Sequence, residues 1–374
     1  MMGFTVNGFQ AAGVHCGLKL DDRDLALVAS DAPCTAAGVF TTNRVRAAPV
    51  LYDEAIVRAG GAVRAVVANA GNANACTGEQ GARDARAMAQ AAARALDWEP
   101  GEVLVLSTGV IGVPLAMDKV AAGIEQAAAQ LRADGWQDAA LAIMTTDAYP
   151  KLAGVTLDAG CTIAGIAKGA GMIAPNRATM LAVIATDAAV PQAALQNMLS
   201  QAVEVSFNRI VVDGDMSTND TVLLLANGAS GVEVADDDGN FTVALAGVCT
   251  ALAQQLVRNA EGATKFVTLH VSGARDEADA RAVAHAIATS PLCKTAFYGA
   301  DPNWGRVVAA AGYSGAEVEA SKLALWLLDA GGETLMQFVS AGTPADFDEG
   351  AAKALMTQPE WGLRLDLGLG SAEA

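Results

Sequence analysis

The chain has 374 residues, of which 52% are hydrophobic and 17% are charged. This balance is typical of a globular protein and excludes an intrinsically disordered chain, and the length favours about two domains. The net charge is −17 and no basic stripe occurs, so nucleic acid and anionic membranes are not expected as partners. No apolar run approaches the roughly 18 residues that a membrane helix needs.

The first residues, MMGFTVNGF, lack the basic and apolar regions of an export signal, so we expect a cytoplasmic protein. The six cysteines are scattered without CxxC or another metal-binding spacing, which predicts buried thiols and no metal site. The three histidines, His15, His270 and His285, are far apart in the sequence. A histidine general base is therefore unsupported, and a base of another kind is more attractive.

The first half of the chain alternates between short apolar strands and helices. Strand-like segments are FTVNGF, LALVAS and AAGVFTT within the first 50 residues, then 62–69 and 103–106. An Ala-rich segment predicts a helix at about 80–96. Pro114 is suited to the first position of a second helix, which is expected to stop near Gly135. Residues 155–167 are typical of a hairpin.

The second half continues this alternation. Strands are expected at 180–186, on both sides of the polar loop in SFNRIVVDGDMSTNDTVLLLANG, at KFVTLHVSG, at 323–329 and at 363–369. Helices are expected at about 195–205, 242–259 and 276–289, with a short one beyond KTAFYGADPNWGR. The sequence shows no repeat and no clean domain boundary. Alternating strands and helices predict the α/β class, with mixed sheets and flanking helices.

Several apolar strands end in small polar loops: Asn69–Gly78, Ser107–Gly112, Thr145–Asp147, Lys168–Thr179 and Asp213–Thr221. Any one of these loops could be an ordinary turn. Five of them, rich in Thr, Asn and Gly, indicate a pocket built from hydroxyls, amides and backbone N–H groups.

The segment KGAGMIAPNRATMLAVIATD places Thr179 at the start of a buried strand, behind a loop that can adopt unusual backbone angles. This position suits a threonine that cuts its own preceding peptide bond and then uses the freed amine as a base. The alternative is a Gly-rich turn that enters a core strand.

Other polar residues have two interpretations each. Ser107, Thr108 and Gly109 could direct a backbone N–H and a hydroxyl at an oxyanion, or could form a turn. Lys168 could bind a substrate carboxylate or extend to solvent. Its Lys-Gly-x-Gly context does not match a phosphate-binding loop. Glu261 could orient a substrate amine or lie solvated at a helix end.

Asp213, Asp215 and Asp220 could chelate a divalent cation, but their spacing does not match a calcium loop. Capping and turn roles are favoured for all three.

Seven motifs together resemble, in order, the glutamate N-acetyltransferase (ornithine acetyltransferase) family of arginine biosynthesis. They are VANAGNANACTG, LSTGVIG, AIMTTDAYPK, AKGAGMIAPNRATML, VDGDMSTNDT, AEGATK and KTAFYGADPNWGR. The resemblance extends from about residue 4 to about residue 370. It implies an α/β fold related to other self-processing N-terminal-nucleophile enzymes.

The resemblance also implies cleavage between Ala178 and Thr179. The products would be an α chain of residues 1–178 and a β chain of residues 179–374, which interleave in one catalytic unit and assemble as an α2β2 heterotetramer. Thr179 is the implied nucleophile, and Thr108 with Gly109 the implied oxyanion hole. Thr145, Lys168, Thr179 and Glu261 fall on substrate-binding positions.

The implied reaction moves an acetyl group from N2-acetylornithine to glutamate through acetyl-Thr179, without cofactor or metal, and some members of the family also accept acetyl-CoA. Water could replace glutamate, which would make the protein an amidase or aminopeptidase, and another acyl-amino acid could be the substrate. A non-enzymatic binding role predicts an intact chain.

Three features depart from the family pattern. The sequence ends at LGLGSAEA, before a tail whose Asn and Thr close over the substrate in the family. Arg177 replaces a hydrophobic residue, usually Met, and is expected to change the rate of cleavage. Met216 replaces a small polar residue.

Overall fold

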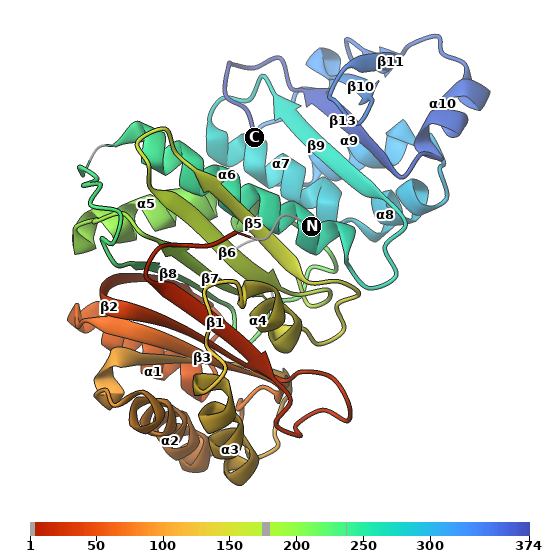
Figure 1. The fold of residues 1–374 in the computed structure, drawn as a ribbon. Coiled ribbons are helices and arrows are strands. Elements are labelled where there is room, and N and C mark those ends of the chain that lie inside the picture. The colour runs from red at the N-terminus through yellow and green to blue at the C-terminus, as the bar shows by residue number, and fades with distance from the viewer. Residues whose placement is uncertain (1–3, 174–179, 237) are drawn as a thin grey trace. The chain divides into compact units, whose positions relative to one another are not determined.

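The structure is a computed structural model that describes residues 4–173, 180–236 and 238–374. The chain divides into two compact units, Met1–Glu261 and Gly262–Ala374 (Figure 1). The boundary falls within AEGATK, which contains neither Pro nor a run of charges, and this is why the sequence shows no linker there. The expected division into chains 1–178 and 179–374 concerns a cleavage rather than compactness, so it stays a prediction.

The first unit contains an eight-stranded sheet with the order β4-β3-β2-β8-β7-β6-β5, and β1 pairs with β2 off this path. Its strands are β1 (Phe9–Val14), β2 (Leu25–Phe40), β3 (Val63–Asn72), β4 (Val103–Val110), β5 (Lys151–Thr156), β6 (Thr162–Lys168), β7 (Leu181–Thr186) and β8 (Thr221–Ala226). The pairs β3–β4 and β7–β8 are parallel, and the other neighbouring pairs are antiparallel. The predicted α/β class with mixed sheets is confirmed.

Six α-helices of the described part of this unit flank the sheet. They are α1 (Ala48–Ala59), α2 (Gly78–Leu96), α3 (Met117–Ala128), α4 (Trp136–Ile143), α5 (Gln192–Glu204) and α6 (Gly239–Arg258). The expected helix at 114–135 is wrong in its bounds, because α3 begins after Pro114 and ends before Gly135. The expected strand at SFNRIVV is also wrong, since Phe207–Arg209 forms a 3-10 turn.

Strand β2 is a single strand of 16 residues, where the sequence predicted two short strand-like segments, LALVAS and AAGVFTT, parted at Pro33. Its first half pairs with β1 and β3, and its second half pairs with β8. The register shifts between Ala29 and Cys34, where the strand changes partners. A proline that lacks an N–H is tolerated at such an irregularity, because no ladder hydrogen bond is lost.

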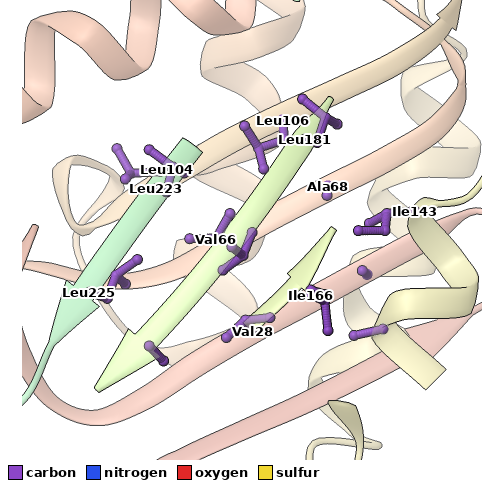
Figure 2. Packing of buried hydrophobic residues seen from close by; sticks show 14 of the residues in the cluster. Val28, Val66, Ala68, Leu104, Leu106, Ile143, Ile166, Leu181, Leu223 and Leu225 are labelled. Carbon is purple, nitrogen blue, oxygen red and sulfur yellow. The ribbon is translucent and has the colours of Figure 1, made fainter. Parts of the chain in front are cut away.

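Because β2 changes partners, the sheet has two halves whose inner faces pack together. Alternate side chains of β4 face opposite sides, as the period of two requires. Val103 and Val105 pack with α2 and α3, whereas Leu104 and Leu106 join a central cluster. Leu181 of β7 contributes to the same central cluster (Figure 2). The other face of β7 and β8 packs with α5 and α6. Helices α2 and α3 thus cover one outer face of the sheet and α5 and α6 another, whereas α1 and α4 contribute side chains to the central cluster.

The second unit contains a five-stranded sheet with the order β12-β11-β10-β13-β9, in which β13 and β9 are parallel. Its elements are β9 (Phe266–Ser272), α7 (Glu277–Thr289), α8 (Pro291–Tyr298), α9 (Trp304–Gly312), β10 (Ala324–Leu328), β11 (Thr334–Ser340), β12 (Thr343–Pro344), α10 (Glu349–Met356) and β13 (Glu360–Asp366). A separate apolar core fills this unit.

Among the described residues, α6 alone has the length and mean hydropathy of a membrane-spanning helix. It has a buried stripe that includes Phe241, Leu245, Leu252 and Leu256, and this stripe belongs to the same cluster as α5 and β7. A helix that buries one apolar stripe inside the protein is typical of a core helix.

We predict that Gly13→Ala destabilises the first unit. A Cβ at this position of β1 would lie 1.9 Å from the carbonyl oxygen of Asp138 in α4, and a backbone atom cannot move aside by changing a rotamer. The expected loss in free energy of unfolding is roughly 1–3 kcal/mol, measured by urea denaturation. Gly61→Ala is the matched control, because no atom lies within 4 Å of the Cβ it would add. Equal effects of the two substitutions would contradict the close approach of α4 to β1.

Candidate active site

The five polar loops that the sequence singled out are connected by hydrogen bonds. The Asn219 amide donates to the carbonyl oxygens of Ser107, at 2.8 Å, and Ala73, at 2.7 Å. The Ser107 hydroxyl donates to Asn69 Oδ1 at 2.6 Å. Since these groups are buried, their mutual bonds satisfy polar atoms that water cannot reach. The ends of β3 and β4 are thus tied to the loop that precedes β8.

Lys168 connects two more of these loops. It is the last residue of β6, it is 2% exposed, and its Nζ donates to Thr108 Oγ1 at 3.2 Å. The next residue, Gly169, donates its backbone N–H to Asp147 Oδ1 at 2.7 Å. The interpretation that Lys168 extends to solvent is therefore wrong, because the strand end carries its ammonium group into the interior.

The backbone at Gly109 requires glycine. Its φ is 133°, and a Cβ there would lie 2.3 Å from the carbonyl carbon of Gly71 on β3. The parallel pairing of β3 and β4 continues to this point, with Gly71 opposite Gly109. Two backbones can approach this closely only without a side chain. The oxyanion-hole role of Thr108 and Gly109 stays a prediction.

Asp147 is the charged group on which this region converges. Its carboxylate accepts the backbone N–H of Thr145 at 2.9 Å, in addition to that of Gly169, and the ammonium of Lys151 at 2.5 Å. Lys151 is fully buried and also donates to Asn259 Oδ1 at 2.6 Å. Thr145 is therefore held by its backbone, close to Lys168.

Burial and charge set the ionisation of these groups. Burial lowers the pKa of Lys168 to about 8, because desolvation of its ammonium outweighs the attraction of Asp147. Burial also acts to raise the pKa of Asp147, but the charges of Lys168 and Lys151 and its hydrogen bonds outweigh this, so the net shift is downward. Asp147 is thus ionised at neutral pH, and Lys168 titrates near the physiological range.

Asp220 lies immediately before β8, which begins at Thr221. Its Oδ1 accepts the backbone N–H of Met180 at 3.0 Å, and Met180 is the residue that follows Thr179 in the chain. Burial raises the pKa of Asp220 well above its usual value. Asp213 accepts the N–H groups of Met172, Ile173 and Asp215. The favoured turn role is confirmed for Asp213, whose carboxylate accepts the N–H two residues on, whereas the Asp220 carboxyl bonds a distant segment and is neither a cap nor a turn. Among the described residues, no group of three or more His, Cys, Asp or Glu side chains could hold a metal ion.

Glu261 lies beside the loop that follows Lys168. Its backbone N–H donates to the carbonyl oxygen of Ala170 at 2.7 Å, and a Cβ on Gly171 would lie 3.0 Å from its carboxylate. Lys168, Thr108, Gly109, Thr145 and Glu261 thus belong to one connected region. Three expected residues, Arg177, Ala178 and Thr179, lie outside the described residues.

The sequence missed Lys151 and Asn259 and did not assign Asp147 a role. Lys151 follows Pro150 at the start of β5, and no sequence pattern distinguishes its burial from the exposure that is usual for lysine. A cavity of about 610 Å³ lies elsewhere, between α1 and the start of α2, and includes Arg46, Tyr52 and Cys76 in its lining. The end of the first polar loop, Asn74 and Cys76 to Gly78, lines it, but none of the predicted catalytic or substrate-binding residues does, so the hydrogen-bonded region is the better candidate.

Comparison with known proteins identifies the family. Residues 10–374 match the model of the ArgJ family, so the chain belongs to that family. A relative from Symbiobacterium thermophilum, the arginine biosynthesis bifunctional protein ArgJ, is 50% identical over 98% of this chain and 92% of its own length. The protein of the same name from Chlorobaculum tepidum is 47% identical, over 99% and 92%.

One solved structure that resembles the chain is ornithine acetyltransferase from Mycobacterium tuberculosis in complex with ornithine. It is 43% identical, with a TM-score of 0.45, and the match covers 47% of this chain and 96% of that chain. The predicted resemblance to the family is confirmed by the family model and the relatives.

We predict that Lys168→Met makes the protein more stable at pH 7. The folded-state pKa of Lys168, about 8, lies below the ordinary lysine value of 10.5, so the folded state resists binding this proton. Below pH 8 the full cost of the buried ammonium is present, and between pH 8 and 10.5 wild-type stability recovers as the folded state releases the proton. The substitution should raise Tm by roughly 3–6 °C at pH 7.

The measurement is a thermal melt of both proteins at pH 7 and pH 9.5, where the difference should shrink. Lys119→Met is the control, because Lys119 is exposed and its ammonium is not desolvated. A wild type that is more stable than Lys168→Met at pH 7 would show that the ammonium is compensated in full.

Proposed function

We propose that this protein transfers an acetyl group from N2-acetyl-L-ornithine to L-glutamate. As a member of the ArgJ family it is an acyltransferase of arginine biosynthesis. The observation that carries the specific proposal is the ammonium of Lys168, buried beside Thr108 at the strand ends. A buried cation in a region of hydroxyls and amides suits the α-carboxylate that both substrates share.

The nucleophile of the proposal is Thr179. Its hydroxyl attacks the carbonyl carbon of Ala178 and the peptide C–N bond breaks, so that the acyl group moves from nitrogen to oxygen. Water then hydrolyses the ester, which yields chains 1–178 and 179–374. The bond between Met180 N–H and Asp220 supports this proposal, because it fixes the first residue after Thr179 against a buried group.

Acetyl transfer then proceeds in two steps. The new α-amine of Thr179 has a reference pKa of about 7.7–8.0, so part of it is neutral and can accept the hydroxyl proton. The oxygen attacks the acetyl carbonyl, ornithine leaves with a proton on its amine, and glutamate removes the acetyl group by the reverse sequence. Donors at Thr108 and Gly109 would stabilise each oxyanion, by roughly 3–4 kcal/mol per donor in comparable sites.

The remaining parts of the proposal follow from this chemistry. Thr145 and Glu261 would contact the substrate, and their bonds to the loops around Lys168 support that role. The reaction needs no cofactor or metal, and acetyl-CoA would act only as an additional acetyl donor. We place the enzyme in the cytoplasm and propose that both chains stay together in an α2β2 assembly.

We predict that Thr179→Ala leaves the chain intact at 37.9 kDa and abolishes acetyl transfer. The substitution removes the oxygen that both cuts the backbone and carries the acetyl group. Intact-mass measurement of the purified wild type should show two fragments that meet at 178/179. Thr179→Ser is the matched control, because it keeps a hydroxyl at the same position. An uncut wild type with full activity would contradict the mechanism.

Product analysis distinguishes transfer from hydrolysis. With acetylornithine as donor, we expect acetylglutamate to form in proportion to glutamate, and little acetate. Acetate that forms at the same rate with and without glutamate would instead show that water is the acceptor, as in an amidase.

A further inference from the structure

Three charged side chains are buried together beside the proposed carboxylate site. Asp147 Oδ1 contacts Lys151 Nζ at 2.5 Å and the backbone N–H of Gly169, which follows Lys168. Lys168 and Lys151 are 2% and 0% exposed. Asp147 therefore pairs directly with Lys151, whereas the Lys168 ammonium donates to Thr108 and is reached by the charge of Asp147 without a direct bond. When all three side chains are charged, their sum is one positive charge.

The same carboxylate holds the backbone around the site. Asp147 Oδ2 accepts the N–H of Thr145. Asn259 Oδ1 accepts hydrogen bonds from the Lys151 ammonium and from the N–H of Ala148, the latter at 3.1 Å. Asn259 closes α6, two residues before Glu261. The loop before β5, the end of β6 and the end of α6 are thus joined through Asp147 and Lys151.

We propose that Asp147 is a positioning residue that keeps the Lys168 side chain protonated for the substrate carboxylate. Lys151 opposes this effect, because its own positive charge disfavours protonation of Lys168. The proposal rests on the acetyl transfer argued above and deepens it. Asp147 does not touch the substrate. It acts through Lys168, by charge, and through Thr145 and Gly169, by backbone hydrogen bonds.

Two further charged groups have a marked effect on Lys168. Asp220 favours its protonation and Lys19 opposes it. Lys19 donates to the carbonyl oxygens of Met144 and Arg23, and the carboxylates of Asp22 and Asp24 are close enough to favour its own charge. After desolvation, Asp147 has the largest effect on Lys168 and Lys151 the next, with opposite signs.

The opposite signs provide the test. In Asp147→Asn, the loss of the carboxylate disfavours protonation of Lys168, so the alkaline limb of kcat/KM for glutamate should move to lower pH. In Lys151→Met, the loss of the competing ammonium should move that limb to higher pH. At pH 7.5 we expect Asp147→Asn to lower kcat/KM at least tenfold, through KM, and to approach wild type again near pH 6.

A merely structural role predicts something else. Damage to packing would lower kcat/KM at every pH and would move both variants in the same direction, and either result would overturn the proposal. Asp53→Asn is the matched control, because Asp53 is a buried carboxyl group that accepts the N–H of Val105 at 2.8 Å and is not among the groups with the largest effects on Lys168. Its pH profile should match wild type.

A second readout does not depend on activity. Wild-type Tm should recover with pH above about 8, as Lys168 releases its proton. This recovery should begin at lower pH in Asp147→Asn and at higher pH in Lys151→Met. An unmoved curve would overturn the charge control by Asp147. If the wild type transfers no acetyl group but the Tm curves of the two variants move as expected, the proposed function is overturned. The effect of Asp147 and Lys151 on the charge of Lys168 would then still hold.

Discussion

The burial of the Lys168 ammonium is the constraint on which the site depends. Desolvating a cation costs several kcal/mol, and a protein retains such a group only where charge and hydrogen bonds compensate for it. Here the compensation comes from Asp147 and from the Thr108 hydroxyl, which belong to different strand ends and loops. The site therefore exists only when those segments are assembled. Its residues are dispersed in the sequence because the interaction is a property of the fold.

The layered arrangement of the first unit explains how these segments meet. Strand β2 pairs with β3 in its first half and with β8 in its second, so the parallel pairs β3–β4 and β7–β8 belong to one continuous sheet whose halves face each other. The central cluster between the halves is apolar and holds them together (Figure 2). Polar groups collect where the strands leave this cluster, as at Ser107 and Asn219. The same strand order therefore forms the apolar core and brings the polar strand ends of the site together.

The sequence predicted most elements, because their apolar periods are regular, and it predicted the family from motifs. It failed where tertiary contacts decide. Pro33 indicated a break between two strands, yet β2 continues through it because the strand changes partners there. The separate helix α4 depends on the close approach of its backbone to Gly13, a contact that no local pattern reveals. Lys151 was missed for the same reason, since its burial depends on Asp147 and Asn259.

The charge balance of the site links stability to substrate binding. Burial raises the pKa of Asp220 well above its usual value, whereas its negative charge favours protonation of Lys168. With Asp147 ionised and both Lys151 and Lys168 protonated, these three side chains carry one positive charge in excess. A substrate carboxylate would supply the missing negative charge and would remove part of the desolvation cost that the folded protein carries. The same excess charge that lowers the stability of the free protein would thus favour an anionic ligand, so stability would be exchanged for binding.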